Sequence, residues 1–480
     1  MKKLLFVLLS ILLIFQLAEA EVEFSQKLYK ELSKTKNKVP HIKIPDYTKF
    51  ELENGMKIYF VEDDELPIIE VEGYIKGGRL QETKDIAGIS GFMFDMMNTG
   101  TKNFNEQELQ EYKNLHGVSF GFSVNNDYFK FGGNSLKSDS EYLISMISEI
   151  LQNPKFDRKY HRRKIMQRYK YLSQNETQEI PLRNEHFYKN LYKDHPYSYS
   201  YNTDLLTDTT SSFQPEKLKK YYNRTIAPNS IVMGIYGDFD ADKMKELVEA
   251  KFSSWKKKEI EYREPELKKP AVDGDIILVH KSDSTQAKII MGYQFYDYSF
   301  KDRIDFLMAN RVFGSGGFQS RLMRNLRSEY GYVYAVHSDT DYYKKGGEFT
   351  ITTGVEPDKT YEVISNIKNE MNKIKNGKEK IKKQELVENI NLYNGIFPKY
   401  YKTKDEVFSS VLYNLEIRDR GANYLNDFIN DYNNITVEKA QQAFEKHTYP
   451  AKFFTVIVGN KEDILPSLKK HDLEIKVIND

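Results

Sequence analysis

The side chains that most often carry enzymatic chemistry are few in this chain and are not grouped. The 480 residues include nine His and no Cys, so thiolate zinc sites, cysteine nucleophiles and disulfides are excluded. No two His stand four residues apart, which is the spacing that places two metal ligands on one helix face. Any metal would therefore have to be bound by His, Asp or Glu. Separately, a Ser-His-Asp hydrolase is not favoured.

A glycine cluster, Gly314 to Gly317, is the one segment with the composition of a phosphate-binding loop. Such loops continue into Gly-Lys-Ser/Thr, whose lysine binds the phosphates. Here Phe318 and Gln319 follow instead. We therefore expect no nucleotide to bind.

The composition indicates a globular protein of more than one domain. Lys and Arg total 71 against 70 Asp and Glu, so a formal charge of +1 gives no basis for binding nucleic acid through bulk charge. Hydrophobic residues make up 40% and aromatic residues 14%, which excludes a disordered chain. The length exceeds what a single hydrophobic core usually supports.

The first twenty residues have the pattern of a cleavable signal peptide. Lys2 and Lys3 precede an apolar run, and Ala18-Glu19-Ala20 offers the small-x-small cleavage site. We expect residues 1–20 to be a signal peptide and residues 21–43 an N-terminal extension. The predicted location is the bacterial periplasm or the outside of the cell, unless the segment is retained as an anchor.

Two sets of similar segments, each repeated at nearly the same offset, indicate that the remaining chain is duplicated. The stretch 136–142 is echoed by 355–361 at an offset of 219, and each opens a run of helical period. Glu216-Lys217, Pro228 and Gly237 recur as Glu438-Lys439, Pro450 and Gly459 at an offset of 222. We predict two homologous domains, 44–258 and 273–480, joined by a charged linker at 259–272.

Each half has the pattern of an α+β domain. In the first half, strands at 56–61 and 68–75 flank a short polar turn and predict a hairpin, and helical or strand-like runs follow at 89–97, 128–131 and 142–151. The second half repeats this order at 275–279, 287–295, 305–327, 348–353 and 361–374. We expect two antiparallel sheets, each packed with helices.

From residue 44 onward the chain resembles the insulinase or pitrilysin peptidases. Leu52-Glu53-Asn54-Gly55-Met56 and Leu66-Pro67-Ile68 resemble the first hairpin of that family, and 88–101 resembles the helix with its inverted zinc motif His-x-x-Glu-His. The resemblance implies the mitochondrial-processing-peptidase-like metallohydrolase fold, which is shared with LuxS. It also implies that the chemistry should centre on that helix.

The chain departs from the family where the metal would bind. The family's two His ligands fall at Gly91 and Asp95, and the glutamate that activates water falls at Phe94. Glycine offers no ligand atom, and phenylalanine can neither bind a metal nor accept a proton. The third family ligand is a Glu further along, but the segment 151–175 contains no Glu and is rich in Lys and Arg. We predict no metal here and hypothesise that Asp95 pairs with a cation of that basic segment.

The second half resembles the noncatalytic halves and subunits of the family. Those proteins use an Arg and a Tyr seven residues apart, which reach into the partner's zinc cleft, and the matching residues are Arg327 and Tyr334. We expect Arg327 to end a helix capped at Gly331 and Tyr334 to lie on the following strand, so that the two side chains can converge. The resemblance implies a catalytic role for both in a partner's site. It also implies substrate binding by Gly314, Gly316 and Gly317, since related processing peptidases receive peptide with a glycine-rich loop there.

The sequence therefore predicts a catalytically inactive subunit that binds unfolded peptide and completes the site of a zinc-bearing insulinase-family partner. No cofactor is expected in this chain, and zinc is expected in the partner. Two alternatives stay open. One is a peptide-binding chaperone or envelope scaffold without a peptidase partner, and the other is a peptidase with unusual ligands such as Asp95 and His161.

Overall fold

A computed structural model describes residues 37–270, 272–471 and 473–479. The predicted signal peptide at 1–20, and the extension as far as residue 36, lie outside the described residues. No helix in the described part of the chain combines the length and the apolar character needed to cross a membrane.

The first half contains a six-stranded sheet whose middle is fully buried. Its strand order is β1-β2-β6-β3-β5-β4. The central strand β6 has the sequence IVMGIYG, and every residue in it is buried. The strands are β1 (Thr48–Glu51), β2 (Lys57–Glu62), β3 (Ile68–Lys76), β4 (Ser119–Val124), β5 (Tyr128–Leu136) and β6 (Ile231–Gly237).

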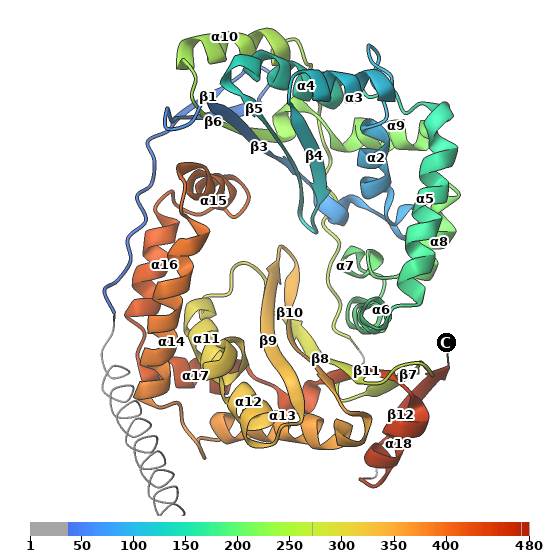
Figure 1. The fold of residues 1–480 in the computed structure, drawn as a ribbon, viewed down its shortest axis with the longest axis vertical. Coiled ribbons are helices and arrows are strands. Elements are labelled where there is room, and N and C mark those ends of the chain that lie inside the picture. The colour runs from blue at the N-terminus through green and yellow to red at the C-terminus, as the bar shows by residue number, and fades with distance from the viewer. Residues whose placement is uncertain (1–36, 271, 472, 480) are drawn as a thin grey trace, which may run out of the picture.

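The second half repeats this arrangement. Its order, β12-β7-β11-β8-β10-β9, matches that of the first sheet strand by strand, apart from the different edge strand beside β7. The strands are β7 (Ile276–His280), β8 (Ala287–Phe295), β9 (Val333–Tyr343), β10 (Gly346–Val355), β11 (Phe454–Gly459) and β12 (Ile475–Asn479). The expected fold class, α+β with two homologous halves, is confirmed, and the two sheets occupy opposite ends of the molecule (Figure 1).

The predicted hairpin between the first two long strands is wrong. Strand β6 lies between β2 and β3, parallel to β2 and antiparallel to β3. The second sheet has the equivalent parallel pair between β7 and β11. Both sheets are therefore mixed rather than purely antiparallel, because a strand from the end of each repeat completes the middle of the sheet.

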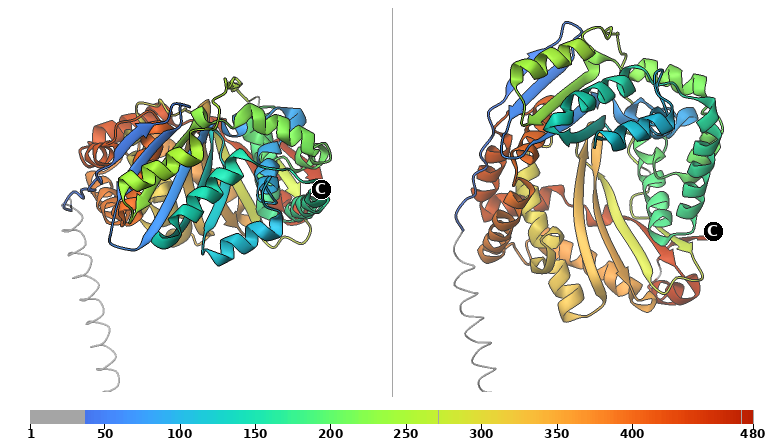
Figure 2. Two further views of the ribbon diagram at one scale, coloured as in Figure 1. Left: turned by 90° about the horizontal axis from the view of Figure 1, so that it is seen from above. Right: turned by 45° about the horizontal axis from the view of Figure 1, so that its top comes forward.

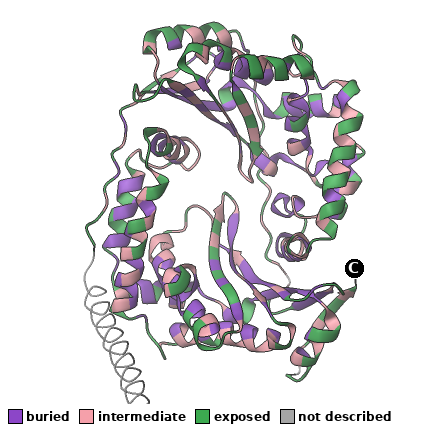
Figure 3. Cartoon of the chain, in the orientation of Figure 1, coloured by how far each residue is buried: buried purple, intermediate pink, exposed green. Residues whose placement is uncertain are grey.

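Helices of each half cover one face of its own sheet and form the main cores. In the first half these helices are α2 (Ile89–Met97), α3 (Glu106–Leu115), α4 (Ser140–Gln152), α9 (Pro215–Thr225) and α10 (Ala241–Phe252). In the second half they are α11 (Arg303–Asn310), α12 (Arg321–Met323), α13 (Thr360–Lys375), α14 (Lys383–Ile396), α16 (Tyr424–Asn433), α17 (Val437–His447) and α18 (Lys461–Lys469). Figure 3 shows the buried residues concentrated where these helices meet the sheets.

Each sheet also receives one helix from the opposite half. Helix α6 (Glu179–Tyr192) packs on the second sheet, where Phe187 stacks on Phe454 with ring centroids 5.6 Å apart. Helix α15 (Lys404–Glu416) packs on the first sheet through Phe408, against the surface of Gly234. A Cβ at Gly234 would lie 2.8 Å from the Phe408 ring, so the glycine makes room for it.

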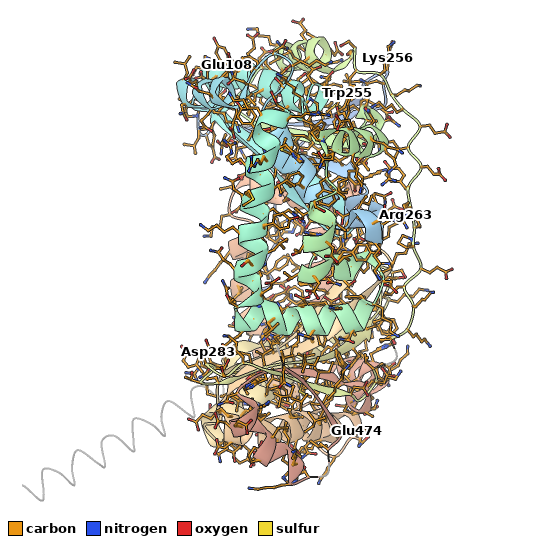
Figure 4. All side chains as sticks on the ribbon, turned by 90° about the vertical axis from the view of Figure 1, so that its right-hand side faces the viewer. Glu108, Trp255, Lys256, Arg263, Asp283 and Glu474 are labelled. Carbon is orange, nitrogen blue, oxygen red and sulfur yellow. The ribbon has the colours of Figure 1, made fainter. Side chains whose placement is uncertain are left out.

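Two groups of helices lie along the sides of the molecule and connect its two ends. Helices α5 (Arg158–Glu176), α7 (Pro196–Tyr199) and α8 (Thr203–Thr210) lie with α6 on one side, and α14 to α16 lie on the other (Figures 1 and 2). The chain after Lys256 runs without helix or strand past Arg263 along the flank of the molecule (Figure 4). The domain boundaries at 44, 258 and 273 remain predictions.

Candidate functional site

Helix α2 presents the positions of the zinc motif. A buried carboxylate caps its start: Glu82 accepts hydrogen bonds from the backbone N–H of Gly88 (2.6 Å) and of Ser90 (3.1 Å). The apolar residues of the helix, among them Phe92 and Met96, are buried in the first core. Gly91 and Asp95, four residues apart, lie one turn from each other on the same face.

The first and last motif positions are open but carry no ligand pair. A Cβ built on Gly91 would meet nothing within 4 Å. Asp95 is exposed, and among the described residues it forms no ion pair within 4 Å, so the hypothesised pairing with the basic segment does not take the form of a direct ion pair. Desolvation by the surrounding protein raises the pKa of Asp95, and the charges of Lys164 and Arg168 oppose that rise.

The position of the water-activating glutamate is part of the hydrophobic core. Phe94 is 3% exposed and stacks on Phe122, with ring centroids 4.3 Å apart. It also meets Phe129 edge to face at 5.2 Å. A carboxylate at this position would face aromatic rings rather than a metal-bound water. The helix therefore provides no general base.

Helix α5, where the third ligand would be expected, carries cationic side chains and a histidine that already contacts a backbone carbonyl. The Nε of Arg168 donates to Thr210 Oγ1 (2.9 Å), and its guanidinium lies beside Gly88 at the start of α2. The Nε2 of His161 lies 2.6 Å from the carbonyl oxygen of Phe213. In the described part of the chain, no three His, Asp or Glu side chains are grouped so that they could hold a metal ion.

The second candidate site lies at the junction of a helical segment and strand β9. Arg327 belongs to a π-helical turn, η7 (Arg324–Glu329), and Gly331, two residues after its end, has a φ of 67°. The N–H of Gly331 donates to the carbonyl of Arg327 (3.1 Å), and that of Tyr332 to the carbonyl of Leu326 (2.9 Å). Each of these nested bonds spans one residue more than its counterpart in a Schellman motif, as suits a π-helical turn, and glycine adopts the left-handed conformation that closes the turn without a Cβ penalty.

The turn brings Arg327 and Tyr334 together, as the sequence predicted. A terminal nitrogen of Arg327 donates to the carbonyl oxygen of Tyr334 (2.8 Å), and its guanidinium carbon lies 4.8 Å from the centroid of the Tyr334 ring. The centroid of the Phe318 ring lies at the same distance, 4.8 Å, from that guanidinium carbon. Arg327 thus contacts two aromatic rings.

This aromatic and cationic patch is open to solvent. Tyr334 is 81% exposed, Phe318 66% and Tyr330 50%. Within the described residues no carboxylate lies within 4 Å of Arg327. Neither a structural ion pair nor a core position therefore explains the two side chains. We call Phe318, Arg327, Tyr330 and Tyr334 the aromatic patch.

The glycine cluster divides into buried and exposed members. A Cβ on Gly314 would lie 2.4 Å from Ser338 Oγ, and one on Gly316 would lie 2.2 Å from Asn389 Oδ1. These two glycines are buried, and the tight packing explains them without a ligand. Gly317 is exposed with nothing near its missing Cβ, and it is the one of the three that a peptide could approach directly.

Ser119 and Phe318 are two residues whose place in the structure differs from what the sequence suggests. Ser119 lies within a Gly-x-Ser-x-Gly sequence, which in some hydrolases marks a nucleophile on a strand-to-helix turn. Here it lies on β4, and its hydroxyl donates to Asn134 Oδ1 (2.8 Å), so that geometry is missing. Phe318 is a site residue that sequence reasoning missed, and its sole signal in the sequence is an aromatic residue directly after a glycine cluster.

The duplicated fold and the helix with zinc-motif spacing define a metallopeptidase-like α+β protein. The chain belongs to the insulinase family, peptidase family M16. The family model "Insulinase (Peptidase family M16)" matches residues 61–204, and the model "Peptidase M16 inactive domain" matches residues 212–393.

Individual relatives are distant. The "Uncharacterized zinc protease YmxG" of Bacillus subtilis is 23% identical over 306 residues, 64% of this chain and 73% of the relative. Helicobacter pylori has two relatives, each 22% identical. Its "Zinc protease PqqE" matches over 57% of this chain and 62% of its own length. Its "Non-peptidase homolog YmxG" matches over 60% of this chain and 65% of its own length.

Solved structures share the fold. A structure described as the peptidase M16 inactive domain from Pseudomonas fluorescens has a TM-score of 0.77 at 19% identity and covers 86% of this chain and 98% of its own. The periplasmic protease PqqL from Escherichia coli has a TM-score of 0.72 at 15% identity, over 89% of this chain and 46% of its own. At these identities the likeness establishes the fold alone.

Proposed function

We propose that this chain is a noncatalytic insulinase-family subunit that binds unfolded peptide and completes the active site of a zinc-bearing partner subunit. One observation carries the proposal. The chain presents Arg327 and Tyr334 together on an exposed surface without an acidic partner, whereas its own zinc-motif positions hold Gly91, Phe94 and Asp95.

The chemistry of the aromatic patch suits a peptide carbonyl. Arg327 donates one hydrogen bond to the backbone of Tyr334, so other guanidinium N–H groups remain to donate to a substrate. The Tyr334 hydroxyl is a second donor on the same exposed surface. Two such donors can orient a scissile carbonyl and stabilise the oxyanion formed from it. Zinc held by the partner would supply the activated water.

The relatives support a division of labour between paired chains. Helicobacter pylori has both a relative named as a zinc protease and one named as a non-peptidase homologue. A cell that encodes this chain is expected to encode a partner with an intact His-x-x-Glu-His motif. The periplasmic relative PqqL, together with the signal-peptide pattern at 1–20, supports a periplasmic or secreted location for both chains.

The test is hydrolysis of an unfolded, fluorescence-quenched peptide by this protein, by the partner, and by their mixture. We expect activity in the mixture alone. Arg327→Ala or Tyr334→Phe should lower the mixture's kcat/KM at least about tenfold, since the loss of one oxyanion donor costs roughly 100-fold to 1,000-fold in known enzymes. Matched controls are Arg324→Ala, on the same turn but paired with Glu385 at 2.7 Å, and Tyr171→Phe, an exposed tyrosine on α5 outside the aromatic patch. A partner as fast alone as in the mixture would contradict the proposal.

A second function draws on the same exposed surface. The aromatic patch could bind unfolded chains without any peptidase, as a chaperone or envelope scaffold would. That function predicts that this protein alone suppresses aggregation of an unfolded client, and that Phe318→Ser weakens the effect. It also predicts no gain in peptide hydrolysis when candidate partners are added.

A further inference from the structure

Arg311, at the start of the glycine loop, is a cation without a counter-ion. It opens the π-helical turn η5 (Arg311–Ser315), directly after α11. Among the described residues it forms no ion pair within 4 Å and donates no hydrogen bond, and its Nε is buried without a partner. An unpaired, largely buried cation is costly in a chain that has 70 acidic residues available to pair with it.

The position of Arg311 is fixed by aromatic packing rather than by charge. Its guanidinium carbon lies 4.5 Å from the centroid of the Tyr393 ring on α14. Burial lowers the pKa of Arg311, and the nearby Tyr393, Tyr432 and Tyr400 oppose that effect. The ring holds the guanidinium plane while leaving its edge without an acceptor. A planar donor edge of this kind is the shape that a carboxylate fits with two parallel hydrogen bonds.

A second unsatisfied donor stands on the same turn. The hydroxyl of Ser315, four residues after Arg311, is also buried without a hydrogen-bond partner. Residues at this spacing on a helical turn are neighbours. Unsatisfied buried polar atoms are rare in folded proteins, so two at one turn require an explanation.

The turn adjoins the aromatic patch. Phe318, which contacts Arg327, follows Arg311 by seven residues on the same loop. On strand β9, His337 is close enough to Arg311 for that charge to lower its pKa, against the larger rise caused by its hydrogen bond with Asp339. The turn also contacts β9, which carries Tyr334, so a peptide that extends from the aromatic patch along β9 would approach Arg311.

We infer that Arg311, assisted by Ser315, binds a carboxylate of the peptide substrate, either an acidic side chain or the C-terminal carboxylate. This assignment rests on the proposed peptide binding and deepens it by giving the subunit a preference for acidic peptides. Arg311 is a binding and positioning residue, and it takes no part in bond cleavage.

The experiment measures the affinity of the purified chain for fluorescein-labelled unfolded peptides by anisotropy. The peptides differ in one internal Glu or Gln and in a C-terminal acid or amide, which separates the two sources of carboxylate. We expect one carboxylate form to bind roughly tenfold or more tightly than its neutral counterpart, the usual worth of a charged hydrogen bond. Arg311→Met should abolish that preference, and Arg311→Lys should retain part of it.

The matched control is Arg420→Met, since Arg420 also lies 4.5 Å from a tyrosine centroid but already donates to Asn414 Oδ1 (3.3 Å). Binding that ignores the carboxylate, or a preference that survives in Arg311→Met or is lost equally in Arg420→Met, would overturn the assignment while leaving peptide binding intact. No binding of any peptide would overturn the proposed function and this assignment with it.

Discussion

The zinc-motif positions of α2 differ from those of a metal site in their side chains and not in their backbone. The helix keeps the spacing that places residues 91 and 95 on one face, and the space beside Gly91 is open. Asp95 is exposed and forms no ion pair within 4 Å with any residue that the structure describes. The geometry for two ligands is therefore present, and the ligands are absent.

Restoring the two ligands should restore zinc affinity without restoring catalysis. The double substitution Gly91→His with Asp95→His is expected to bind zinc roughly tenfold or more tightly than the unmodified chain, because two imidazoles on one helix face chelate the ion. Peptide hydrolysis should stay absent, because Phe94 remains in place of a general base. Competition with a chromophoric zinc chelator measures the affinity.

The paired variant Gly91→Ala with Asp95→Ala controls for helix propensity and loss of charge. Equal zinc affinity in the two double variants, with unchanged far-ultraviolet circular dichroism, would show that α2 is not placed as described.

The helices that cross between halves form the clearest structural feature at the scale of single elements. Helix α6 fixes the second sheet through Glu348 on β10, which is 1% exposed and accepts hydrogen bonds from Tyr343 OH (2.9 Å) and Tyr192 OH. Burial, aided by the charge of Asp341, raises the pKa of Glu348 from 4.5 to about 8. This contact should therefore respond to pH.

The sign of that response follows from proton binding. Between pH 4.5 and about 8 the unfolded chain loses the Glu348 proton while the folded chain keeps it, so this group lowers stability as the pH rises through that window. Below pH 4.5 both states are protonated and the effect is absent. The free energy of unfolding of Glu348→Gln should therefore exceed that of the unmodified chain by an amount that grows from pH 5 to pH 8 and reaches roughly a few kcal/mol at most.

Urea unfolding at a series of pH values tests this prediction, with the exposed Glu356→Gln as the control. A stability difference between Glu348→Gln and the unmodified chain that is constant across the pH range would contradict the raised pKa.

At the scale of the whole molecule, a clasp between hairpin tips joins the two halves. Asp127, in the β4–β5 turn, accepts hydrogen bonds from Tyr197 OH (2.7 Å), from the backbone N–H of Lys344 (2.9 Å) and from Tyr298 OH. Glu264, in the segment connecting the halves, pairs with Lys345 at 2.6 Å and with Lys344. One carboxylate thus joins the tips of the two sheets.

Removing that carboxylate should loosen the halves. Asp127→Ala leaves three donors without their acceptor, and each buried unsatisfied donor costs about 1–3 kcal/mol. We expect a lower urea midpoint and faster trypsin cleavage within residues 256–270. The control is Asp194→Ala, whose side chain is 80% exposed and pairs only with Lys84. Equal cleavage rates for the two variants would argue against the clasp.

The sequence by itself determined the local elements and the identity of the site residues. The helix expected at 89–97 and the strand expected at 287–295 have those bounds in the structure, because each is set by a continuous local pattern of apolar residues. The loss of ligands at Gly91 and Phe94 needed no coordinates, since glycine and phenylalanine have no atom that binds zinc. The meeting of Arg327 with Tyr334 followed from the glycine at 331, which ends the turn.

Only the tertiary structure decided which distant segments meet. Strand β6 enters between β2 and β3, and helices α6 and α15 cross to the opposite sheets. The same holds for Phe318 against Arg327, for Arg311 against Tyr393, and for the burial of Gly314 and Gly316. Local periodicity shows which face of an element is apolar, but the partner that covers that face is chosen by packing over the whole chain, to which residues hundreds of positions apart contribute.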